Sequence, residues 1–323
     1  MTRARRLRRA GAVLAGMLVA VAATYLAGEW YKGRDFLSWF RDQKAPLIEV
    51  RETVVAEAPG HRVVHVELTD TRGLEAEGYL RVPGSASGPW PALLILGGVR
   101  TGKRVVDFVG DTGDWLVLGL DYPYAGRRSG LGRLEFIAAL PAMRRAVLDT
   151  VPAGMLAVDY LVSRPDVDPG RIVLAGGSFG ALLAPALGAA DERISAVAIF
   201  FGAGDLDALI GANLDLTWPI EPVATWLGSV IVSPLEPLKY VGRISPRPVF
   251  MLNGTEDVAM PVRCSSALHD AAREPKTVVW LDLGHVDIRS EEFHSRVIAE
   301  FVHWLRAIGL SDPGTDFQLG ALH

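Results

Sequence analysis

The strongest constraint on the fold of this chain is a tight glycine-serine turn between an apolar run and a helix-like segment. Residues 176–180 read Gly-Gly-Ser-Phe-Gly and follow the apolar residues 171–175. The helix-like stretch 181–187 comes directly afterwards. A strand, Gly-x-Ser-x-Gly and a helix form the context in which this pattern predicts a turn that presents a nucleophile. Glycines let neighbouring backbone pass without a Cβ clash, and the helix N-terminus favours negative charge beside Ser178.

A serine nucleophile needs a base to take its proton and an acid to orient that base. Where a serine follows a strand in this way, the acid and the histidine come later in the chain, on loops after further strands. Residues 247–254 read as a buried strand and Asp257 follows it, while 277–283 read as another strand and His285 follows that. Parallel strands bring their carboxyl ends to one sheet edge. Ser178, Asp257 and His285 are therefore predicted to meet there as a catalytic triad.

Together these motifs resemble the α/β-hydrolase superfamily, and within it the dienelactone-hydrolase-like and acyl-esterase-like branch. The resemblance rests on Val-Asp-Pro-Gly-Arg-Ile at 167–172, Ile-Ser-Pro-Arg-Pro-Val at 244–249, Gly-x-x-Asp-x-x-x-Pro at 254–261 and Gly-His at 284–285. It covers roughly residues 48–310, the length of one α/β domain. It implies an α/β fold with a mostly parallel central sheet, antiparallel N-terminal strands, helices on both faces and a short cap insertion.

The acid has alternatives. Glu256 is adjacent to Asp257, and either carboxylate can orient a histidine. Some hydrolases that this chain resembles carry the acid one strand earlier, which here points to Asp205 or Asp207. The Gly-x-x-Asp spacing favours Asp257. The base is less ambiguous, since among the seven histidines only His285 follows both a glycine and the end of an apolar strand.

The oxyanion hole requires two preorganised donors. One is expected from the backbone N–H of Phe179, the residue after the nucleophile. The other is expected from the loop after the apolar strand 91–96, where Gly98 or Val99 would supply it. Leu96 stands where many esterases have the histidine of a His-Gly-Gly motif, but the donor is backbone and so is retained.

A rival interpretation concerns the same loop. Residues 97–103 fit Gly-x-x-x-x-Gly-Lys, most of a phosphate-binding loop. Arg104 then replaces the serine or threonine that would coordinate magnesium, and the ordered Ser, Asp and His would have to be accidental. Nucleotide hydrolysis is therefore disfavoured.

The resemblance implies a serine hydrolase that cleaves carboxylic esters or thioesters through an acyl-enzyme intermediate, without a cofactor. An acyltransferase and a serine peptidase use the same triad and remain alternatives. A catalytically silent binding or scaffold protein is the alternative of another class; an intact triad argues against it, although a fold alone does not fix function.

Substrate contacts are harder to predict. Residues 203–240 occupy the place of a cap and are rich in apolar side chains, including Trp218 and Trp226. An apolar lid would favour an acyl or aryl group, whereas the same side chains could equally be core contacts. Arg127 is expected near the same sheet edge and is a candidate for a substrate carboxylate, although exposed arginines are usually only solvated.

Composition excludes several classes of function. Half of the 323 residues are hydrophobic, the net charge is −4, and there is no basic stripe with interleaved aromatics, so nucleic acid is not an expected partner. The single cysteine, Cys264, excludes an intrachain disulfide and a cysteine-rich metal site. No His-Glu-x-x-His or similar cluster occurs, so no metal is expected.

The N-terminus predicts a membrane segment. Residues 1–9 are strongly basic and 10–28 carry no charge, a length that can span a bilayer. Basic residues stay on the cytoplasmic side, which predicts an anchored protein with its catalytic domain outside the cytoplasm. A cleaved signal peptide with Ala20–Ala22 as the cleavage site, or a twin-arginine signal at Arg5–Arg6, would instead give a secreted protein. Residues 29–47, with Trp30 and Trp39, read as an interfacial linker.

The rest of the chain fits one catalytic domain over 48–310 followed by a loose tail, 311–323. Residues 47–55 and 62–69 read as strands, and 74–82 alternate apolar and polar side chains as in a half-exposed antiparallel strand. A final helix is predicted from Ser290, with an apolar packing face.

Overall fold

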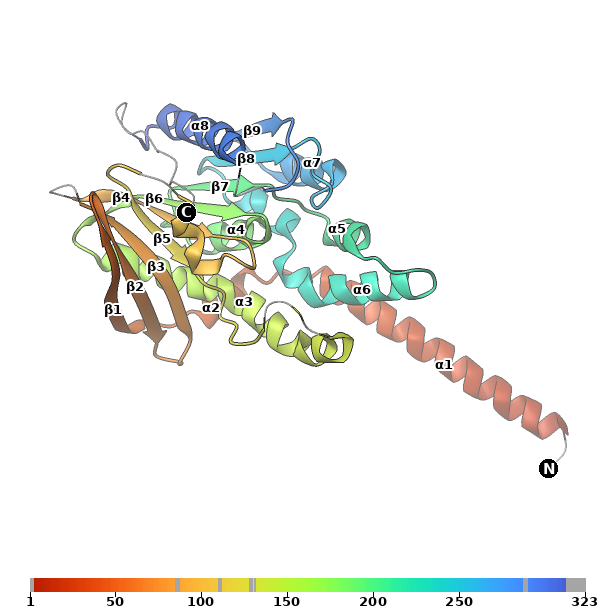
Figure 1. Ribbon diagram of the computed structural model, residues 1–323. Helices are drawn as coiled ribbons and strands as arrows, with labels where there is room; N and C mark the ends of the chain where they lie inside the picture. The colour runs from red at the N-terminus through yellow and green to blue at the C-terminus, as the bar shows by residue number, and fades with distance from the viewer. Residues whose placement is uncertain are drawn as a thin grey trace.

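The computed structural model describes residues 3–84, 88–109, 112–127, 130, 132–286 and 290–311 (Figure 1). The strands are β1 (Leu47–Ala58), β2 (His61–Asp70), β3 (Glu75–Pro83), β4 (Trp90–Leu96), β5 (Leu116–Leu120), β6 (Val167–Gly177), β7 (Ala196–Phe200), β8 (Val249–Gly254) and β9 (Lys276–Leu281). The α-helices are α1 (Arg3–Lys32), α2 (Leu37–Gln43), α3 (Arg133–Ser163), α4 (Phe179–Ala190), α5 (Leu206–Asn213), α6 (Ile220–Val232), α7 (Val262–Ala271) and α8 (Glu291–Ala307). The 3₁₀ turns are η1 (Gly102–Asp107), η2 (Ser233–Leu235), η3 (Pro237–Lys239) and η4 (Val241–Arg243).

The strands form one nine-stranded sheet in the order β1-β2-β3-β5-β4-β6-β7-β8-β9. β1, β2 and β3 pair antiparallel, as does β3 with β5, and from β5 to β9 all pairs are parallel. The alternation predicted for 74–82 is confirmed, because Ala76, Gly78, Leu80 and Val82 are buried and the side chains between them are less so. The predicted α/β fold with antiparallel N-terminal strands and a parallel remainder is thus confirmed.

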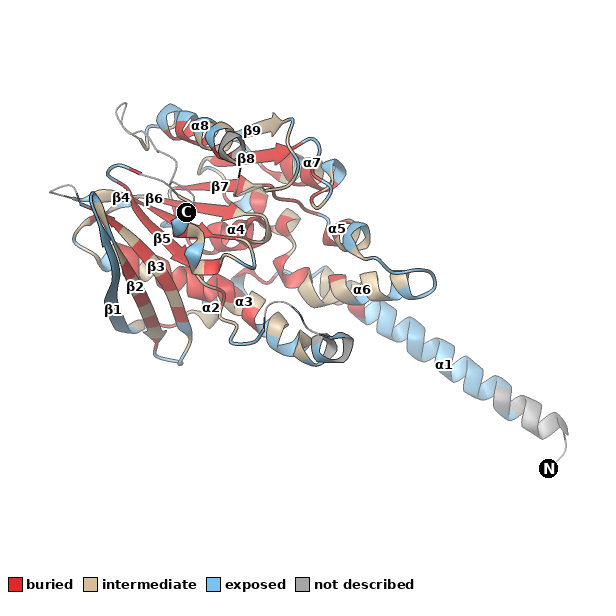
Figure 2. Cartoon of the chain, in the orientation of Figure 1, coloured by how far each residue is buried: buried red, intermediate tan, exposed pale blue. Residues whose placement is uncertain are grey.

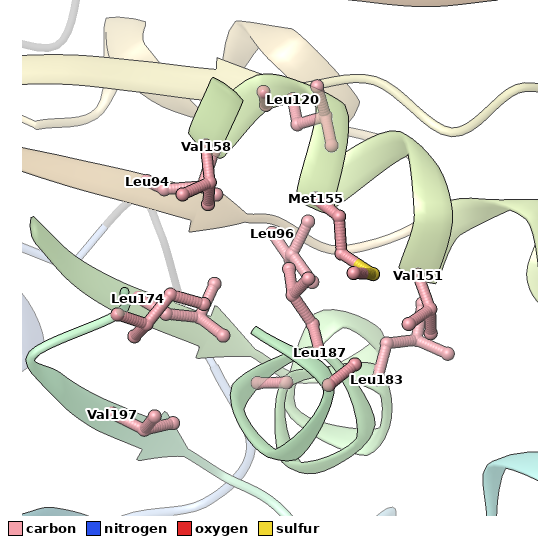
Figure 3. Close-up of a cluster of buried hydrophobic side chains, with 14 of the residues drawn as sticks. Leu94, Leu96, Leu120, Val151, Met155, Val158, Leu174, Leu183, Leu187 and Val197 are labelled. Atoms are coloured by element: carbon pink, nitrogen blue, oxygen red, sulfur yellow. The ribbon is translucent and has the colours of Figure 1, made fainter. Parts of the chain in front are cut away.

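Helices cover both faces of the sheet (Figure 1). On one face α2, α3 and α4 bury a large apolar cluster, part of which Figure 3 shows between the strands and the two longer helices. On the other face α8 packs through Phe301, Trp304 and Leu305 against residues of the central strands. The apolar face predicted for the C-terminal helix is a packing face, as expected, and that helix begins within one residue of Ser290.

Within the described chain two helical stretches are long and apolar enough to cross a membrane, Gly11–Lys32 and Ala138–Ser163. The second lies in α3 and is 72% buried against the sheet, so its apolar character belongs to the core. The first is only 6% buried and projects from the molecule, where Figure 2 shows most of α1 in the colour of exposed residues.

The region expected to form a cap, 203–240, contains α5, α6 and the turns η2 and η3. It packs beside the C-terminal end of α1 (Figure 1). Of the tail expected over 311–323, only Ser311 lies within the described residues.

Candidate active site

The turn between β6 and α4 holds Ser178 in a backbone conformation that few non-glycine residues adopt. Its φ is 54° and its ψ is −113°. Two glycines make this turn fit: a Cβ on Gly176 would lie 2.6 Å from the carbonyl oxygen of Gly180, and a Cβ on Gly180 would collide with the carbonyl oxygen of Leu96. The Ser178 amide donates to the carbonyl of Phe200, 3.0 Å away on the neighbouring strand β7. The turn is thereby fixed to the strands on either side of it.

The structure brings His285 onto this serine. Ser178 Oγ lies 2.7 Å from His285 Nε2, which places the hydroxyl to donate to that nitrogen. His285 follows β9 by four residues, and its ring meets the buried Phe201 edge-on, with 6.0 Å between ring centroids. An edge-on aromatic neighbour restricts how far the imidazole can rotate away from the serine.

Asp257 stands on the other side of the imidazole. His285 Nδ1 lies 2.7 Å from Asp257 Oδ2, and the carboxylate has no exposed surface. The second oxygen, Oδ1, accepts the backbone N–H groups of Ala259 and Met260, both at 2.9 Å. These bonds satisfy the buried carboxylate and fix its direction, so that it favours the tautomer with the proton on Nδ1.

The other carboxylates considered for the acid have different partners. Glu256 is exposed. Asp205 caps α5 by accepting the Ala208 amide at 3.2 Å, and Asp207 forms an ion pair with Lys32 at 2.6 Å. The geometry therefore places Asp257 alone of the four against His285 Nδ1.

A cluster of buried polar side chains lies beside the loop that holds Asp257 and connects β8 to α7. Asn253, at the end of β8, donates to the carbonyl of Gly202 at 2.8 Å and to Ser265 Oγ at 3.0 Å. Its carbonyl oxygen lies 2.9 Å from Nε2 of His269, a side chain of α7. Burial lowers the pKa of His269 from 6.5 to about 4, with a smaller effect of Lys276. This histidine is neutral at pH 7 and joins α7 to β8, the strand that precedes Asp257.

The loop after β4, from which an oxyanion donor was expected, lines the same cavity as Ser178. Phe179 begins α4, where the backbone N–H has no acceptor in a preceding turn. Gly97 accepts the Tyr122 hydroxyl through its carbonyl, and the Tyr122 ring meets Phe179 edge-on at 5.2 Å. Gly98 accepts the Thr101 amide and hydroxyl, each at 3.0 Å. These contacts hold the loop in place, and Gly98 and Val99 line the same cavity as Ser178 and Phe179.

The same loop does not form a phosphate cradle with its lysine. Lys103 binds Glu77 at 2.6 Å and lies over the ring of Tyr79, with 5.2 Å from Nζ to the ring centroid. Lys103 itself belongs to the six-residue 3₁₀ turn η1, and no α-helix begins there.

A cavity of about 640 Å³ opens beside Ser178 and His285. Its floor comes from β4, β6 and β7, one wall from η1 and the residues after it, and the other from α8. Phe179, Gly98 and Val99 also line it. The other lining side chains are mostly apolar and include Leu93, Ile95, Phe108, Val297 and Phe301. A cavity of this size and character is suited to an apolar group of a small ligand.

The residues expected to contact substrate lie elsewhere. Trp218 is 82% exposed in the segment before α6. Trp226 stacks on Tyr25 of α1, with ring centroids 5.6 Å apart. Arg127 is exposed and donates to the carbonyl of Gly130 at 3.0 Å. None of these three is among the described residues that line the cavity beside Ser178.

The cavity residues of η1 and α8 were not identified from the sequence as part of a site. The apolar face of the C-terminal helix was visible, but a packing face and a cavity wall have the same pattern. His294, which is 9% exposed, also lines the cavity and gives no sequence signal of its own. Among the residues that the structure describes, no group of three or more His, Cys, Asp or Glu side chains is arranged to hold a metal ion.

Comparison with solved structures agrees with this architecture. An acetyl xylan esterase from Paenibacillus sp. R4 superposes with a TM-score of 0.61 over 86% of this chain and 93% of its own, at 17% identity. A putative dienelactone hydrolase from Klebsiella pneumoniae subsp. pneumoniae MGH 78578 gives a TM-score of 0.54 over 81% and 99%, at 14% identity. At these identities the likeness concerns the fold, and it agrees with the predicted branch of the α/β hydrolases.

Sequence relatives cover a shorter region. The uncharacterized protein YfhR of Salmonella typhi is 30% identical over 143 residues, 42% of this chain and 48% of the relative. YfhR of Escherichia coli (strain K12) is 29% identical over 147 residues, 45% and 48% of the two chains. The chain thus spans about half the length of the curated relatives it matches.

A family model matches a longer stretch of the chain than these two relatives do. It describes the prolyl oligopeptidase family and matches residues 148–309, half of the 323 residues and a range that contains Ser178, Asp257 and His285. On this match, and with the sheet order and site geometry in agreement, the chain belongs to the prolyl oligopeptidase family, within the α/β-hydrolase superfamily.

Proposed function

We propose that this protein is a serine hydrolase that cleaves carboxylic esters, thioesters included, through an acyl-enzyme on Ser178. The observation that carries the proposal is the continuous chain of contacts from Ser178 Oγ to His285 and on to Asp257, each link 2.7 Å long, at the mouth of an apolar cavity. Membership of a hydrolase family supports it. The catalytic domain is proposed to extend over residues 48–310.

In the first half of the reaction Ser178 Oγ attacks the ester carbonyl while His285 Nε2 takes the hydroxyl proton. Asp257 stabilises the imidazolium that results and does not itself need to accept a proton. Collapse of the tetrahedral intermediate breaks the bond to the leaving alkoxide, which receives the proton from His285. In the second half His285 removes a proton from water, the hydroxide attacks the acyl-enzyme, and the proton returns to Ser178.

Two backbone amides are proposed to stabilise the oxyanion. The first is the amide of Phe179, which also benefits from the positive end of α4. The second is the amide of Gly98 or Val99 on the loop after β4. That loop is held by Tyr122 and Thr101, so the donors are positioned before the substrate arrives.

The cavity supports an ester with an apolar acyl or aryl group. Most of its described lining side chains are apolar, as at Val297, Phe301 and Phe108. Arg100, Thr101 and His294 also line it, so a few polar groups interrupt the apolar surface. Burying each additional methylene there would contribute roughly 0.8 kcal/mol to binding. An apolar group of several carbons is therefore expected to be preferred over acetate.

Peptide hydrolysis is a second candidate, favoured by the description of the matching family as prolyl oligopeptidases. The same three side chains would serve, because an amide is attacked through the same tetrahedral intermediate. Transfer of the acyl group to an alcohol instead of water differs only in the acceptor.

We further propose that α1 anchors the protein in a membrane with the catalytic domain outside the cytoplasm. The apolar stretch Gly11–Lys32 is 22 residues long and 6% buried, and basic residues precede it. At 1.5 Å per residue such a helix is about 33 Å long, close to the thickness of a hydrocarbon core. Cleavage of this segment as a signal peptide, which would release a secreted protein, is the alternative.

The test of the activity compares the full chain in mild detergent with its Ser178→Ala variant. Both are treated with a fluorophosphonate probe and with p-nitrophenyl esters of increasing acyl length. Labelling and turnover should be lost in the variant, by about 10⁴-fold or more for turnover. A folded wild-type protein that is not labelled, or a variant that still turns over, would refute the assignment.

The acid is tested by a matched pair of carboxylates. Asp257→Asn should lower kcat by about 10³ to 10⁴-fold, because the amide cannot hold the tautomer that the base requires. Asp205→Asn keeps the helix cap of α5 and should retain nearly full activity. Equal losses in the two variants would show that the triad acid has been misassigned.

A further inference from the structure

Helix α6 and the segment before it carry a row of exposed apolar side chains. Trp218 is 82% exposed, Ile220 62%, Val223 57%, Leu227 47% and Leu216 40%. Positions 220, 223 and 227 are spaced by three and four residues, so that they share one face of the helix. The whole stretch 214–232 contains no lysine or arginine. A contiguous apolar surface of this kind marks an interaction site.

This surface is attached to the end of α1. The Tyr25 ring stacks on Trp226, and Trp226 Nε1 donates to Glu29 at 2.9 Å. Gly28 makes the close packing feasible, since a Cβ there would collide with the Trp226 ring. One turn later Lys32 binds Asp207, the second residue of α5, at 2.6 Å.

Helix α3 adds a third point of attachment. Arg144 donates through Nη2 to the Tyr31 hydroxyl at 2.6 Å and through Nε to the carbonyl of Ile231 at 3.2 Å. One guanidinium thus joins the ends of α1 and α6. The orientation of α6 relative to α1 is set by the folded protein rather than by a free linker.

The contacts of α6 and α5 with α1 are confined to one level along α1, near its C-terminal end. They lie between Tyr25 and Lys32, in the last two turns of the apolar stretch, where its first carboxylate, Glu29, occurs. If residues 11–28 fill the hydrocarbon core, this level corresponds to the headgroup region. Trp30, 67% exposed, lies at the same level, where aromatic side chains prefer to be.

We propose that the exposed face of α6, together with the end of α1, docks into the interfacial layer of the lipid bilayer that α1 enters. The inference rests on the membrane placement of α1 proposed above. Continuity with α1 selects the bilayer over a protein partner, because α6 packs beside the end of α1 (Figure 1). Its exposed apolar side chains are therefore next to the level assigned to the headgroups. Exposed apolar side chains at this level would insert between the headgroups and the acyl chains.

The docking also orients the active site. α5 and α6 follow the carboxyl end of β7, and Ser178 follows the carboxyl end of β6, the parallel neighbour of β7. The docked helix and the catalytic serine therefore belong to the same edge of the sheet. The protein would hold that edge toward the membrane, where apolar esters dissolve.

The test places a polarity-sensitive NBD fluorophore at single cysteines in the full chain, in phosphatidylcholine vesicles. The buried Cys264 is first replaced by alanine, so that only the introduced thiol reacts. Val223→Cys reports on α6, and Leu18→Cys reports on the middle of α1. Val54→Cys on β1 is the matched control, since Val54 and Val223 are 52% and 57% exposed. Quenching by nitroxide-labelled lipid is measured for each.

The expected result is quenching at positions 18 and 223 that exceeds quenching at position 54 by at least about twofold, as for side chains inserted in the interface. Quenching at 18 with position 223 as weakly quenched as 54 would overturn the docking of α6 while leaving α1 in the membrane. Weak quenching at all three positions would overturn both proposals. Ile220→Cys, on the same face, repeats the measurement if the first α6 variant does not fold.

Discussion

The two faces of the central sheet are formed by the same strands, but the side chains on them have different surroundings. On β4, Leu94 and Leu96 face α3 and α4 and are completely buried in the packed cluster of Figure 3, and Leu96, the last residue of the strand, also borders the cavity. Leu93 and Ile95, which alternate with them, face the other way and line the cavity beside Ser178. One face stabilises the fold, and the other leaves room for a substrate.

The difference arises from what covers each face. The packed face is covered by three helices, α2, α3 and α4, whose apolar side chains join one cluster with those of the strands. The other face is covered by α8 and by the short turn η1, between which the cavity remains. Close packing of the first face supports the strained turn at Ser178, since a void beneath it would let the turn relax.

Adjacent leucines on β4 test this contrast most strongly. Leu94→Ala should lower the free energy of unfolding by about 3–5 kcal/mol, because a fully packed site cannot collapse around the void. Leu93→Ala should cost about 2 kcal/mol or less, since part of that side chain already borders empty space. Urea unfolding of both variants measures the difference. Equal costs would show that the two faces are packed alike.

The stability of the packed side should also depend on pH through His269. Its pKa is lowered from 6.5 to about 4 by burial, so that the unfolded chain binds the proton first as the pH falls. Stability that is present above pH 6.5 should therefore decline as the pH falls toward 4, by an amount on the order of 3 kcal/mol.

The control for this effect is His269→Gln, which can still donate to Asn253 but does not titrate. Unfolding midpoints between pH 7 and 4 should fall more steeply for the wild type than for this variant. Parallel curves would mean that other groups cause the acid sensitivity.

The catalytic residues and the cavity differ in how well the sequence could predict them. The glycine-serine turn, the two later strands and their loops predicted the positions of Ser178, Asp257 and His285 because each depends on local geometry and on chain order. The cavity could not be predicted in the same way. A strand buried on both faces is a solid apolar run, and Leu93 and Leu94 look alike in it.

The prediction of the cap illustrates the same limit. Trp218 and Trp226 were expected near a substrate because the segment is apolar and follows β7. In the structure Trp226 packs on Tyr25 and Trp218 is exposed. Apolar composition does not distinguish a lid, a core contact and a surface directed to a membrane, since the partner of α6 comes from a helix about 200 residues earlier.

The cavity face should respond to substitution through selectivity rather than stability. Val297→Phe adds volume to the cavity wall on α8. We expect the ratio of kcat/KM for an eight-carbon acyl ester to that for an acetyl ester to fall about tenfold or more, since a few methylenes of lost space are worth 1–3 kcal/mol. Val54→Phe, on exposed β1, is the control and should leave the ratio unchanged. An unchanged ratio in Val297→Phe would exclude this cavity as the acyl site.

The smallest effect is expected at Arg127, which lies on neither face. Its guanidinium is exposed and donates to the carbonyl of Gly130, three residues away, and it is not among the described residues that line the cavity. An exposed charge is screened by water and contributes little to recognition. Arg127→Ala should therefore change the ratio of turnover on a carboxylate-bearing ester to turnover on its neutral analogue by less than about twofold. A selective loss of the charged substrate would show that the loop closes over the site during binding, and that a polar contact supplements the apolar cavity in selecting the substrate.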